Sequence, residues 1–443
     1  MRELEPGVHL VNEPGHLTPG HSPDCICLLD KRRSFSFGNA MTKKGSPVHP
    51  ALARRGEGVC ADGLFEMPTR AVFGRGVARR VGEVARGLGG THAMVVTDPG
   101  VLALGIAAPI VAELESAGIS VTVFDRVQPN PRDVHCLEAA QLARERSLDL
   151  FVGVGGGSAI DTAKCAAVLL TNGGHPRDWE DFGALVHTPT PVIALPTTAG
   201  TGSEVSPSAI ITDTVRRKKM NLFDPRICPR VALVDPDLTM SMPPTLTAST
   251  GMDALSHAVD SLHCRLATPA SDALALEGAR LIALHLRRAF LEPTNVEARC
   301  GMAQASLVAG LAVGITDVSG CHCLAESIGA VYEHPHGVCC AVTMPIIMEY
   351  NLPVSVAKYI RLASAFGIQP QGRSESGLAQ AAVDFVLELN RELGIPALST
   401  LIRSDDLDLL AEKAAANTSR PSNPREAGKD SFRTMLESAL VGA

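Results

Sequence analysis

The chain has 443 residues, which is long enough for two or three domains with substantial cores. Hydrophobic residues make up 45% and charged residues 20%, as in soluble globular enzymes, and the net charge of −7 argues against a nucleic-acid partner. No stretch approaches the roughly 20 apolar residues of a membrane span, so we expect no membrane partner. The N-terminus lacks a signal-peptide pattern, and the twelve cysteines are scattered. These features predict a cytoplasmic protein with reduced thiols.

Residues 1–62 differ from the rest of the chain. They are rich in proline, glycine, histidine and basic residues and show no sustained hydrophobic period. We predict a disordered extension outside the fold. A functional tail is the alternative.

Residues 63–242 alternate between short apolar runs and helical patterns. Strands are expected at 92–98, 120–125, 150–154 and 191–196, and helices at 102–117 and 133–146. Apolar strands separated by helices of this length indicate a parallel sheet. This segment is therefore predicted to be an α/β domain.

Residues 243–443 have a different character. Long amphipathic stretches dominate, at 247–262, 271–290, 296–311, 354–366 and 377–393. We expect an all-α domain here, because no comparable strand pattern is present.

A glycine run joins a predicted strand to a predicted helix at Gly155-Gly156-Gly157-Ser158. Glycines let the backbone approach a ligand, and a helix N-terminus offers free N–H groups to a pyrophosphate. A plain strand-to-helix turn is the alternative. A second loop, 196–204, also follows a strand and is rich in small hydroxyls, so the pair favours a dinucleotide site.

Asp98 ends the first predicted strand. An acidic side chain at this place can bind the 2′-hydroxyl of an adenosine ribose and repels a 2′-phosphate. The sequence thus favours NAD over NADP.

Two pairs of residues suggest a metal centre. Asp253 and His257 are four apart on a predicted helix and project from nearly the same face. His322 and His336 could add two imidazoles. One carboxylate and three imidazoles suit a divalent transition metal. For a single histidine, a packed or surface position is the usual alternative.

Cysteines surround the second pair of histidines. Cys321 and Cys323 flank His322 and superficially suggest a thiolate zinc site. Alternation along a helix points them away from the face of His322, so we expect core packing instead. The same expectation holds for Cys339 and Cys340.

Several motifs, in order, resemble the iron-containing (group III) alcohol dehydrogenases. They are residues 155–164, 196–205 and 251–258, and the Pro335-His336-Gly337 tripeptide. The similarity extends from about Phe65 to Glu426 and omits the N-terminal extension. It implies an α/β dinucleotide-binding domain, an all-α metal-binding domain, and an active site in the cleft between them. This is a dehydroquinate synthase-like architecture.

The resemblance also implies site residues. The metal is Fe²⁺ or, in some members, Zn²⁺, and the positions that match its ligands are Asp253, His257, His322 and His336. His336 matches the motif better than His334 does. The positions that match cofactor-binding residues are Asp98, Asn130, Gly155, Gly156, Gly157, Ser158, Asp161, Thr197, Thr198, Thr201 and Lys219.

The implied activity is hydride transfer between NAD and a small alcohol or its aldehyde or ketone, with the metal as a Lewis acid on the substrate oxygen. A homo-oligomer is expected. One alternative is a hydroxyacid–oxoacid transhydrogenase with bound NAD. Another is a dehydroquinate synthase-like lyase, which needs a basic cluster that the helical half lacks near the ligands. A binding protein without catalysis is disfavoured by the intact ligand set.

The sequence departs from the family at a few positions. Glu326, one helical turn after His322, stands where many members have a second histidine with a proton-relay role. We take Glu326 as the catalytic candidate; a further metal ligand and an inert surface residue are alternatives. Val313, Ile315 and Ser319 replace a frequent aromatic, asparagine and glycine, and Val313 should leave more room for substrate.

Overall fold

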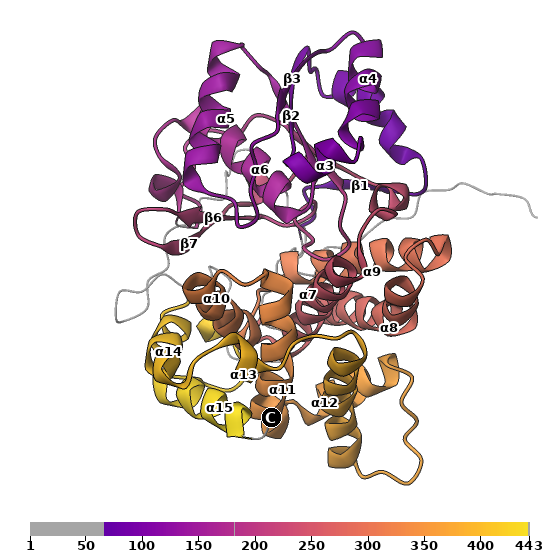
Figure 1. Ribbon diagram of the computed structural model, residues 1–443, viewed down its shortest axis with the longest axis vertical. Helices are drawn as coiled ribbons and strands as arrows, with labels where there is room; N and C mark the ends of the chain where they lie inside the picture. The colour runs from indigo at the N-terminus through magenta and orange to yellow at the C-terminus, as the bar shows by residue number, and fades with distance from the viewer. Residues whose placement is uncertain (1–65, 181, 442–443) are drawn as a thin grey trace, which may run out of the picture. The chain divides into compact units, whose positions relative to one another are not determined.

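A computed structural model of the protein describes residues 66–180 and 182–441, all within one compact unit. The predicted extension at 1–62 lies outside the described residues. Strands occur only in the first part of the described chain, and helices follow from Pro244 onward (Figure 1). The predicted α/β part followed by an all-α part is confirmed. The exact domain limits at 62 and 242 stay predictions.

The α/β part is built on a six-stranded sheet in which every pair of neighbours is parallel. The strand order is β1-β8-β5-β4-β2-β3. The bounds are β1 Arg70–Phe73, β2 His92–Val96, β3 Ser120–Phe124, β4 Leu150–Gly155, β5 Val192–Pro196 and β8 Val231–Val234. The central strands β4 and β5 are buried along their whole length, as in sheets covered on both faces.

Helices cover both faces because successive strand residues point in opposite directions. One apolar cluster joins Met94 and Val96 to α5 (Asp133–Glu145) and α6 (Gly157–Asn172). The other joins Ala93 and Val95 to the opposite layer. That layer consists of η1 Val77–Arg80, α2 Val81–Gly87, α3 Pro99–Ala103 and α4 Ala107–Ser116.

The structure differs from the sequence prediction in this part. The single helix expected at 102–117 is wrong, because Gly105 adopts a φ of 73° and separates α3 from α4. Two strands, β1 and β8, were not expected, nor was the antiparallel hairpin of β6 (Ser208–Asp213) and β7 (Lys218–Phe223). Three short turns complete the part: η2 Pro176–Trp179, η3 Pro225–Ile227 and η4 Pro236–Thr239.

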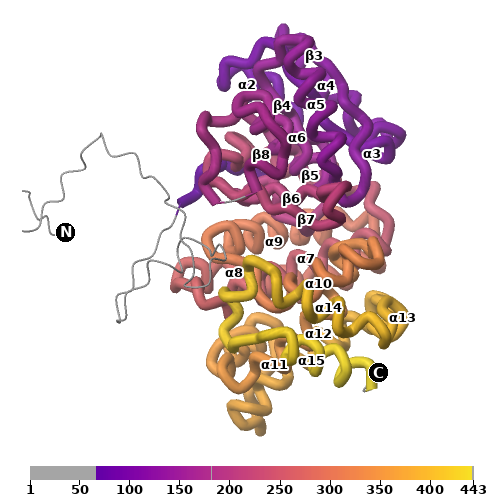
Figure 2. The backbone as a smooth tube through the Cα atoms, turned by 90° about the vertical axis from the view of Figure 1, so that its left-hand side faces the viewer, coloured from indigo at the N-terminus to yellow at the C-terminus, as the bar shows by residue number. Residues whose placement is uncertain are grey.

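The helical part surrounds one large apolar core. Its long helices are α7 Pro244–His263, α8 Pro269–Leu291, α9 Val296–Gly314, α10 Gly320–Tyr332, α11 His336–Ala365 and α12 Glu375–Glu392. Shorter elements follow: α13 Leu398–Leu401, η5 Ser404–Asp406, α14 Leu407–Ala415, η6 Arg420–Ser422 and α15 Lys429–Val441. The last two helices, yellow in Figure 2, pack against each other.

The helix α11 is longer than expected. It continues through Pro345 and Pro353, so the separate helix predicted at 354–366 is wrong. By length and composition it is the one helix among the described residues that could cross a membrane. However, 56% of its most apolar window is buried inside the protein, and the core helix of a soluble protein passes the same test.

The loop after β5 packs directly on the helical part. A Cβ added to Gly202 would lie 2.6 Å from the Cα of Gly310 on α9, and one added to Gly200 would lie 2.6 Å from the carbonyl oxygen of Thr250 on α7. Larger side chains would push the loop away from both helices. These glycines therefore bring the predicted nucleotide loop next to the helix that carries Asp253.

Candidate functional site

The predicted nucleotide residues gather at the carboxyl edge of the sheet. Asp98 follows β2, Gly155 ends β4, and Thr197 follows β5. The chain runs outward from β2 to β3 on one side and from β4 to β5 on the other. Adjacent strands whose connections diverge in this way form a topological switch point, where ligands bind in open α/β sheets.

The glycine turn is shaped by the threonine loop beside it. Gly155 has a φ of 156°, and a Cβ there would lie 2.7 Å from the Cβ of Ala159. A Cβ on Gly156 would meet Thr198 at 3.3 Å, and one on Gly157 would meet Thr201 at 2.9 Å. The absence of side chains leaves the backbone N–H groups at the start of α6 accessible to an anion.

Asp98 lies beside this turn. Its Oδ1 accepts hydrogen bonds from the backbone N–H groups of Gly100 (2.9 Å) and Val101 (3.0 Å), so it caps α3. Its Oδ2 lies 3.4 Å from the place of a Cβ on Gly155. The carboxylate is thus oriented by the helix and faces the turn, and its contact with a ribose stays a prediction.

Asp161 is buried, and its carboxylate is hydrogen-bonded to other groups of the protein. Its carboxylate accepts hydrogen bonds from the hydroxyl of Ser203 and the N–H of Ile210, the latter at 2.9 Å. The ammonium of Lys164 lies 3.6 Å away. Asp161 therefore fastens the threonine loop to α6. A direct contact between Asp161 and the nucleotide stays a prediction.

The remaining cofactor candidates lie near the same edge. Asn130, in the loop after β3, has a φ of 55°, and Ser158 lies in the first turn of α6. Lys219 lies on β7, with its Nζ 4.0 Å from the place of a Cβ on Gly329 of α10. Lys219 therefore connects the nucleotide side to the helices that carry the predicted metal ligands.

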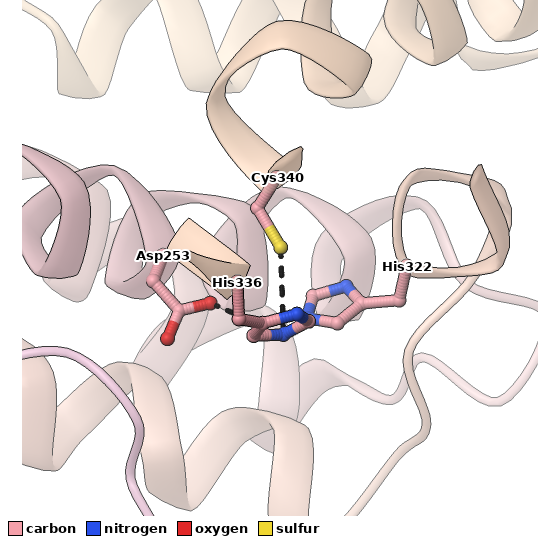
Figure 3. A group of neighbouring side chains, drawn as sticks. All are labelled: Asp253, His322, His336 and Cys340. Carbon is pink, nitrogen blue, oxygen red and sulfur yellow. Dashed lines mark hydrogen bonds and ion pairs between the residues drawn. The ribbon is translucent and has the colours of Figure 1, made fainter. Parts of the chain in front are cut away.

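Those ligands come together from three helices. Asp253 and His257 lie on α7, His322 lies in the first turn of α10, and His336 is the first residue of α11. Ligand atoms of Asp253, His322, His336 and Cys340 all lie within 4.8 Å of one another (Figure 3). The Nε2 atoms of His336 and His257 lie 3.7 and 3.9 Å from Asp253 Oδ1. The rings of His257 and His322 are stacked at 5.0 Å.

The hydrogen bonding of this cluster fits a bound cation. Four buried polar atoms find no hydrogen-bond partner among the described residues: Asp253 Oδ1, His257 Nδ1, His322 Nε2 and His336 Nδ1. An unpaired buried polar atom is costly and rare in a native protein. Asp253 Oδ1 and His322 Nε2 face the cluster, whereas His257 and His336 turn Nε2, not the unpaired Nδ1, toward Asp253. The two unpaired atoms that face the cluster, together with carboxylate and imidazole chemistry, fit a divalent ion.

The protonation states also suit a cation. Burial lowers the pKa of His257, and burial followed by the charge of Lys219 lowers the pKa of His336 to about 3. Burial alone would raise the pKa of Asp253, but the neighbouring histidines, led by His257, bring it below its usual value. Neutral imidazoles, as at His257 and His336, and an ionised carboxylate, as at Asp253, are the forms that bind metals. His322 differs, because burial is outweighed by Cys340 and Asp260, which raise its pKa well above the ordinary value, so it must lose a proton to bind a cation.

A glycine fixes the position of His336. A Cβ on Gly337 would collide with the carbonyl oxygen of Ser249 on α7 and would lie 3.3 Å from the Cβ of Asp253. The start of α11 can therefore touch α7 only with glycine after the histidine. This contact explains the Pro335-His336-Gly337 motif in physical terms.

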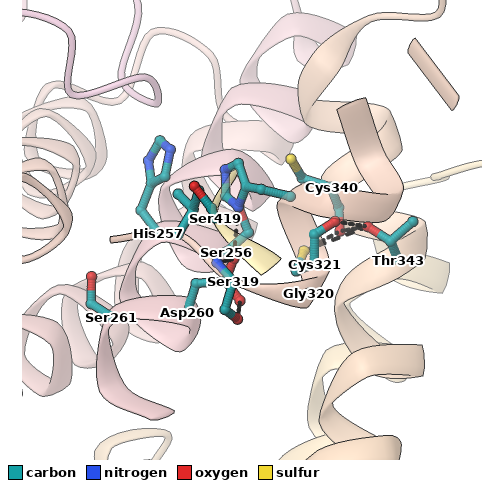
Figure 4. A network of polar contacts seen from close by, with 12 residues as sticks. Ser256, His257, Asp260, Ser261, Ser319, Gly320, Cys321, Cys340, Thr343 and Ser419 are labelled. Carbon is teal, nitrogen blue, oxygen red and sulfur yellow. Dashed lines mark hydrogen bonds and ion pairs between the residues drawn. The ribbon is translucent and has the colours of Figure 1, made fainter. Parts of the chain in front are cut away.

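A buried carboxylate that the sequence analysis did not single out orients His322. Asp260 Oδ2 accepts from the Nδ1–H of His322 and from the N–H of Ser319, both at 2.8 Å (Figure 4). Its Oδ1 accepts from the Ser319 hydroxyl at 2.6 Å and lies 3.1 Å from His263 Nε2. These bonds place the hydrogen on Nδ1 and leave His322 Nε2 facing the cluster. The sequence signal was its spacing of three residues from His257.

Cys340 packs in the core, as predicted. Its Sγ also lies 3.5 Å from His336 Nε2, inside the ligand cluster, which the prediction did not anticipate. Cys321 also lies closer to the site than expected, within 4.8 Å of ligand atoms of Asp260 and His322. Cys323 and Cys339 are fully buried, as predicted. The overlooked signal was spacing: Cys340 follows His336 by four residues, as His257 follows Asp253.

Two candidates lie outside the cluster. Glu326 Oε2 accepts a hydrogen bond of 2.7 Å from the side-chain amide of Asn417, so the structure does not place it as a further ligand. Its role in proton transfer stays a prediction. His334 donates from Nε2 to the carbonyl oxygen of Leu401 at 2.9 Å, which leaves His336 as the ligand candidate.

The predicted nucleotide edge and the possible metal cluster together suit a metal-dependent oxidoreductase. Residues 68–236 match the family described as "Iron-containing alcohol dehydrogenase", and residues 247–440 match "Fe-containing alcohol dehydrogenase family, C-terminal". The chain belongs to the iron-containing alcohol dehydrogenase family.

Curated relatives agree with this assignment. The chain is 34% identical to the NAD-dependent methanol dehydrogenase of Bacillus methanolicus, over 85% of this chain and 99% of that one. It is 37% identical to the choline dehydrogenase of Bacillus subtilis, over 83% and 92%. It is 35% identical to the 1,3-propanediol dehydrogenase of Citrobacter freundii, over 85% and 98%.

Solved structures share the fold. A 1,3-propanediol oxidoreductase superposes with a TM-score of 0.83 at 35% identity, covering 85% of this chain and all of that one. An alcohol dehydrogenase from Oenococcus oeni gives the same TM-score at 34% identity. A metal-dependent alcohol dehydrogenase with NAD and a divalent cation fits these relatives better than the transhydrogenase or the lyase considered above.

Proposed function

We propose that this protein oxidises a small primary or secondary alcohol with NAD, and reduces the corresponding aldehyde or ketone, in the cleft between the carboxyl edge of the sheet and the metal-ligand cluster. One observation carries the proposal. Ligand atoms of Asp253, His322 and His336 lie within 4.8 Å of one another, and Asp253 Oδ1 and His322 Nε2 are buried without a hydrogen-bond partner among the described residues.

Each region has a defined task in this proposal. Asp253, His257, His322 and His336 would hold the cation, which supplies Lewis acidity to the substrate oxygen. Asp260 keeps His322 in one tautomer and orientation. The bare backbone at Gly156 and Gly157 receives the pyrophosphate, and Asp98 favours a ribose without a 2′-phosphate.

The relatives support a small substrate, and Val313 supports some extra room beside it. The relatives are named for methanol, choline, 1,3-propanediol and lactaldehyde, all of them small molecules. In this chain Val313, in the last turn of α9, is smaller than the aromatic residue common in the family. We expect a preference for short alcohols with some tolerance for branching.

The test is a panel of alcohols and aldehydes with NAD(H) and NADP(H), run on protein loaded separately with Fe²⁺ and with Zn²⁺. We expect metal-dependent formation of free NADH from short alcohols and much weaker activity with NADP. No activity with any alcohol in either metal form would contradict the proposal. Oxidation that requires an added oxoacid, without release of NADH, would favour the transhydrogenase instead.

We further propose that the enzyme works in the cytoplasm as a homo-oligomer, without nucleic acid or membrane. Every cysteine that the structure describes is free, which suits a reducing compartment. Fractionation of the native host and light scattering of the purified full chain would test location and assembly. A membrane-bound pool or a strictly monomeric enzyme would contradict this part.

A further inference from the structure

The thiol of Cys340 lies among the predicted metal ligands and has no role in the function proposed above. It belongs to α11, one turn after His336, and its side chain points into the cluster (Figure 3). Its Sγ, Asp253 Oδ1, and ligand nitrogens of His322 and His336 form a set within 4.8 Å of one another. His257 is not a member of this compact set.

The spacing of the donor atoms matches a shared cation. Around a tetrahedral zinc ion, a sulfur at about 2.3 Å and a nitrogen at about 2.0 Å lie about 3.5 Å apart. The observed distance between Cys340 Sγ and His336 Nε2 is 3.5 Å. The 3.7 Å between His336 Nε2 and Asp253 Oδ1 is slightly wider than this geometry requires.

Burial and the neighbouring unpaired atoms support the same interpretation. Cys340 is fully buried, and the carboxylate oxygen of Asp253 and Nε2 of His322 beside it find no hydrogen-bond partner among the described residues. Both of those residues are more than nine-tenths buried. The sulfur therefore faces unpaired groups that a cation would satisfy.

We propose that Cys340 is a sulfur ligand of the cation, and that it shifts the preference of this site from hard ions such as Fe²⁺ and Mn²⁺ toward softer ions such as Zn²⁺ and Cd²⁺. The inference rests on the proposed function only in using the same cation site. On binding, the sulfur forms a bond to the cation and the thiol proton passes to solvent. Soft sulfur ligands favour zinc-like ions, whereas carboxylates favour hard ones.

The first test is optical. Metal-free protein is loaded with Co²⁺, a probe of the zinc position whose bond to a thiolate gives a charge-transfer band in the near ultraviolet. We expect the band in the wild type and in Cys339→Ser, and its loss in Cys340→Ser. Cys339 is a matched control because it is an equally buried neighbour on the same helix, outside the compact set. A band of equal intensity in Cys340→Ser, or no band in Co²⁺-loaded wild type, would overturn the proposal.

The second test measures selectivity. The Kd values for Cd²⁺ and Mn²⁺ are determined by competition with a chelator. Cys340→Ser should weaken Cd²⁺ binding by about tenfold or more, as ligand-sphere changes typically do, and change Mn²⁺ binding much less. Equal weakening of both ions would mean that Cys340 only packs beside the ligands.

Folding is checked in each variant by thermal unfolding of the metal-free protein. If Cys340→Ser does not fold, Cys340→Ala carries both tests, because it removes the sulfur without placing a hydroxyl in the buried site. Failure here is distinct from failure of the proposed function. The cobalt band is read without alcohol or NAD, whereas the proposed function fails only if loaded wild-type protein transfers no hydride.

Discussion

The two halves of the site are built from different parts of the chain. At the predicted nucleotide edge the backbone would bind the ligand, because Gly155, Gly156 and Gly157 have no side chains. At the predicted metal cluster side chains would bind the ligand, and four of their buried atoms have no hydrogen-bond partner among the described residues. We therefore expect nucleotide binding to be weakened by side chains added at the glycines, and metal binding to be weakened by the removal of a ligand side chain.

The two halves also differ in electrostatics. The nucleotide edge offers N–H groups at a helix start, which carry a partial positive charge. The metal cluster offers one carboxylate and three imidazoles, two of which, on His257 and His336, have lowered pKa values, and a second buried carboxylate, Asp260, lies behind His322. We therefore expect the first half to bind an anion and the second a cation, and we expect a change in one half to leave the other intact.

The largest effect should follow from His322→Ala. It removes a predicted ligand and leaves Asp260 Oδ2 without the imidazole of His322. We expect metal content and alcohol oxidation to fall to background, while the protein stays folded and still binds NAD. Metal analysis, steady-state kinetics and NAD titration check this. Full activity in the variant would refute the metal site. Loss of NAD binding would show that the two halves are not independent.

The matching variant in the nucleotide half is Gly157→Ala, which adds a methyl group to the glycine turn. The new methyl group would lie 2.9 Å from Thr201 Cγ2, so the turn or the threonine loop must shift. Overpacking of this kind costs roughly 1–3 kcal/mol, and we expect NAD affinity to fall by about tenfold or more with metal content unchanged. Isothermal titration with NAD measures it. Gly87→Ala is the control, because that helical glycine has open space around it. Unchanged NAD affinity would exclude the turn from the site.

A smaller effect is expected from Asp260→Asn. The amide cannot accept from His322, Ser319 and His263 as the carboxylate does, so His322 loses its fixed tautomer. Second ligand-shell changes typically lower metal affinity by about 10–100-fold. Chelator competition measures the Kd. Asp272→Asn is the control, because Asp272 is also buried and pairs with Lys358 instead. Equal losses in both variants would mean a general loss of stability.

The fold was largely predictable because the spacing of hydrophobic residues along the sequence shows which face of a helix or strand is buried. The central strands and the long amphipathic helices were expected at nearly the observed positions. The edge strand β1 was missed because its residues alternate only weakly between exposed and half-buried. The helix α11 was divided because proline inside a helix is unfavourable, and here packing in the core outweighs that cost.

The site was predictable where one helix presents two ligands, as at Asp253 and His257. It was not predictable where helices distant in sequence meet. Asp260 on α7 meets His322 on α10 across 62 residues of sequence. Cys340 approaches Asp253 because Gly337 allows α11 to touch α7. The bonds of Asp161 to Ser203 and Ile210 were likewise not predictable, because those partners lie 42 and 49 residues away in the sequence.

The stability of the metal-free protein should depend on pH because of His336. Its pKa is about 3 in the folded, metal-free protein, against 6.5 as the ordinary value. Between these limits the unfolded chain binds a proton at this residue that the folded chain does not. The free energy of unfolding should therefore fall as the pH drops from about 6.5 toward 3. Denaturant unfolding of metal-free wild type and His336→Ala should show a smaller pH dependence in the variant. If the free energy of unfolding changed with pH equally in the wild type and in His336→Ala, this prediction would be contradicted.

The smallest effect is expected from a change at Glu326, which lies outside the metal-ligand cluster. The carboxylate is held by Asn417 rather than by the cluster. We expect Glu326→Gln to keep the metal and NAD, and to shift the pH–rate profile because the amide cannot accept or release a proton. The control is Asn417→Ala, which frees the carboxylate without removing it and should change the profile less. An unchanged profile in Glu326→Gln would make Glu326 a structural partner of Asn417 and would leave proton transfer to solvent.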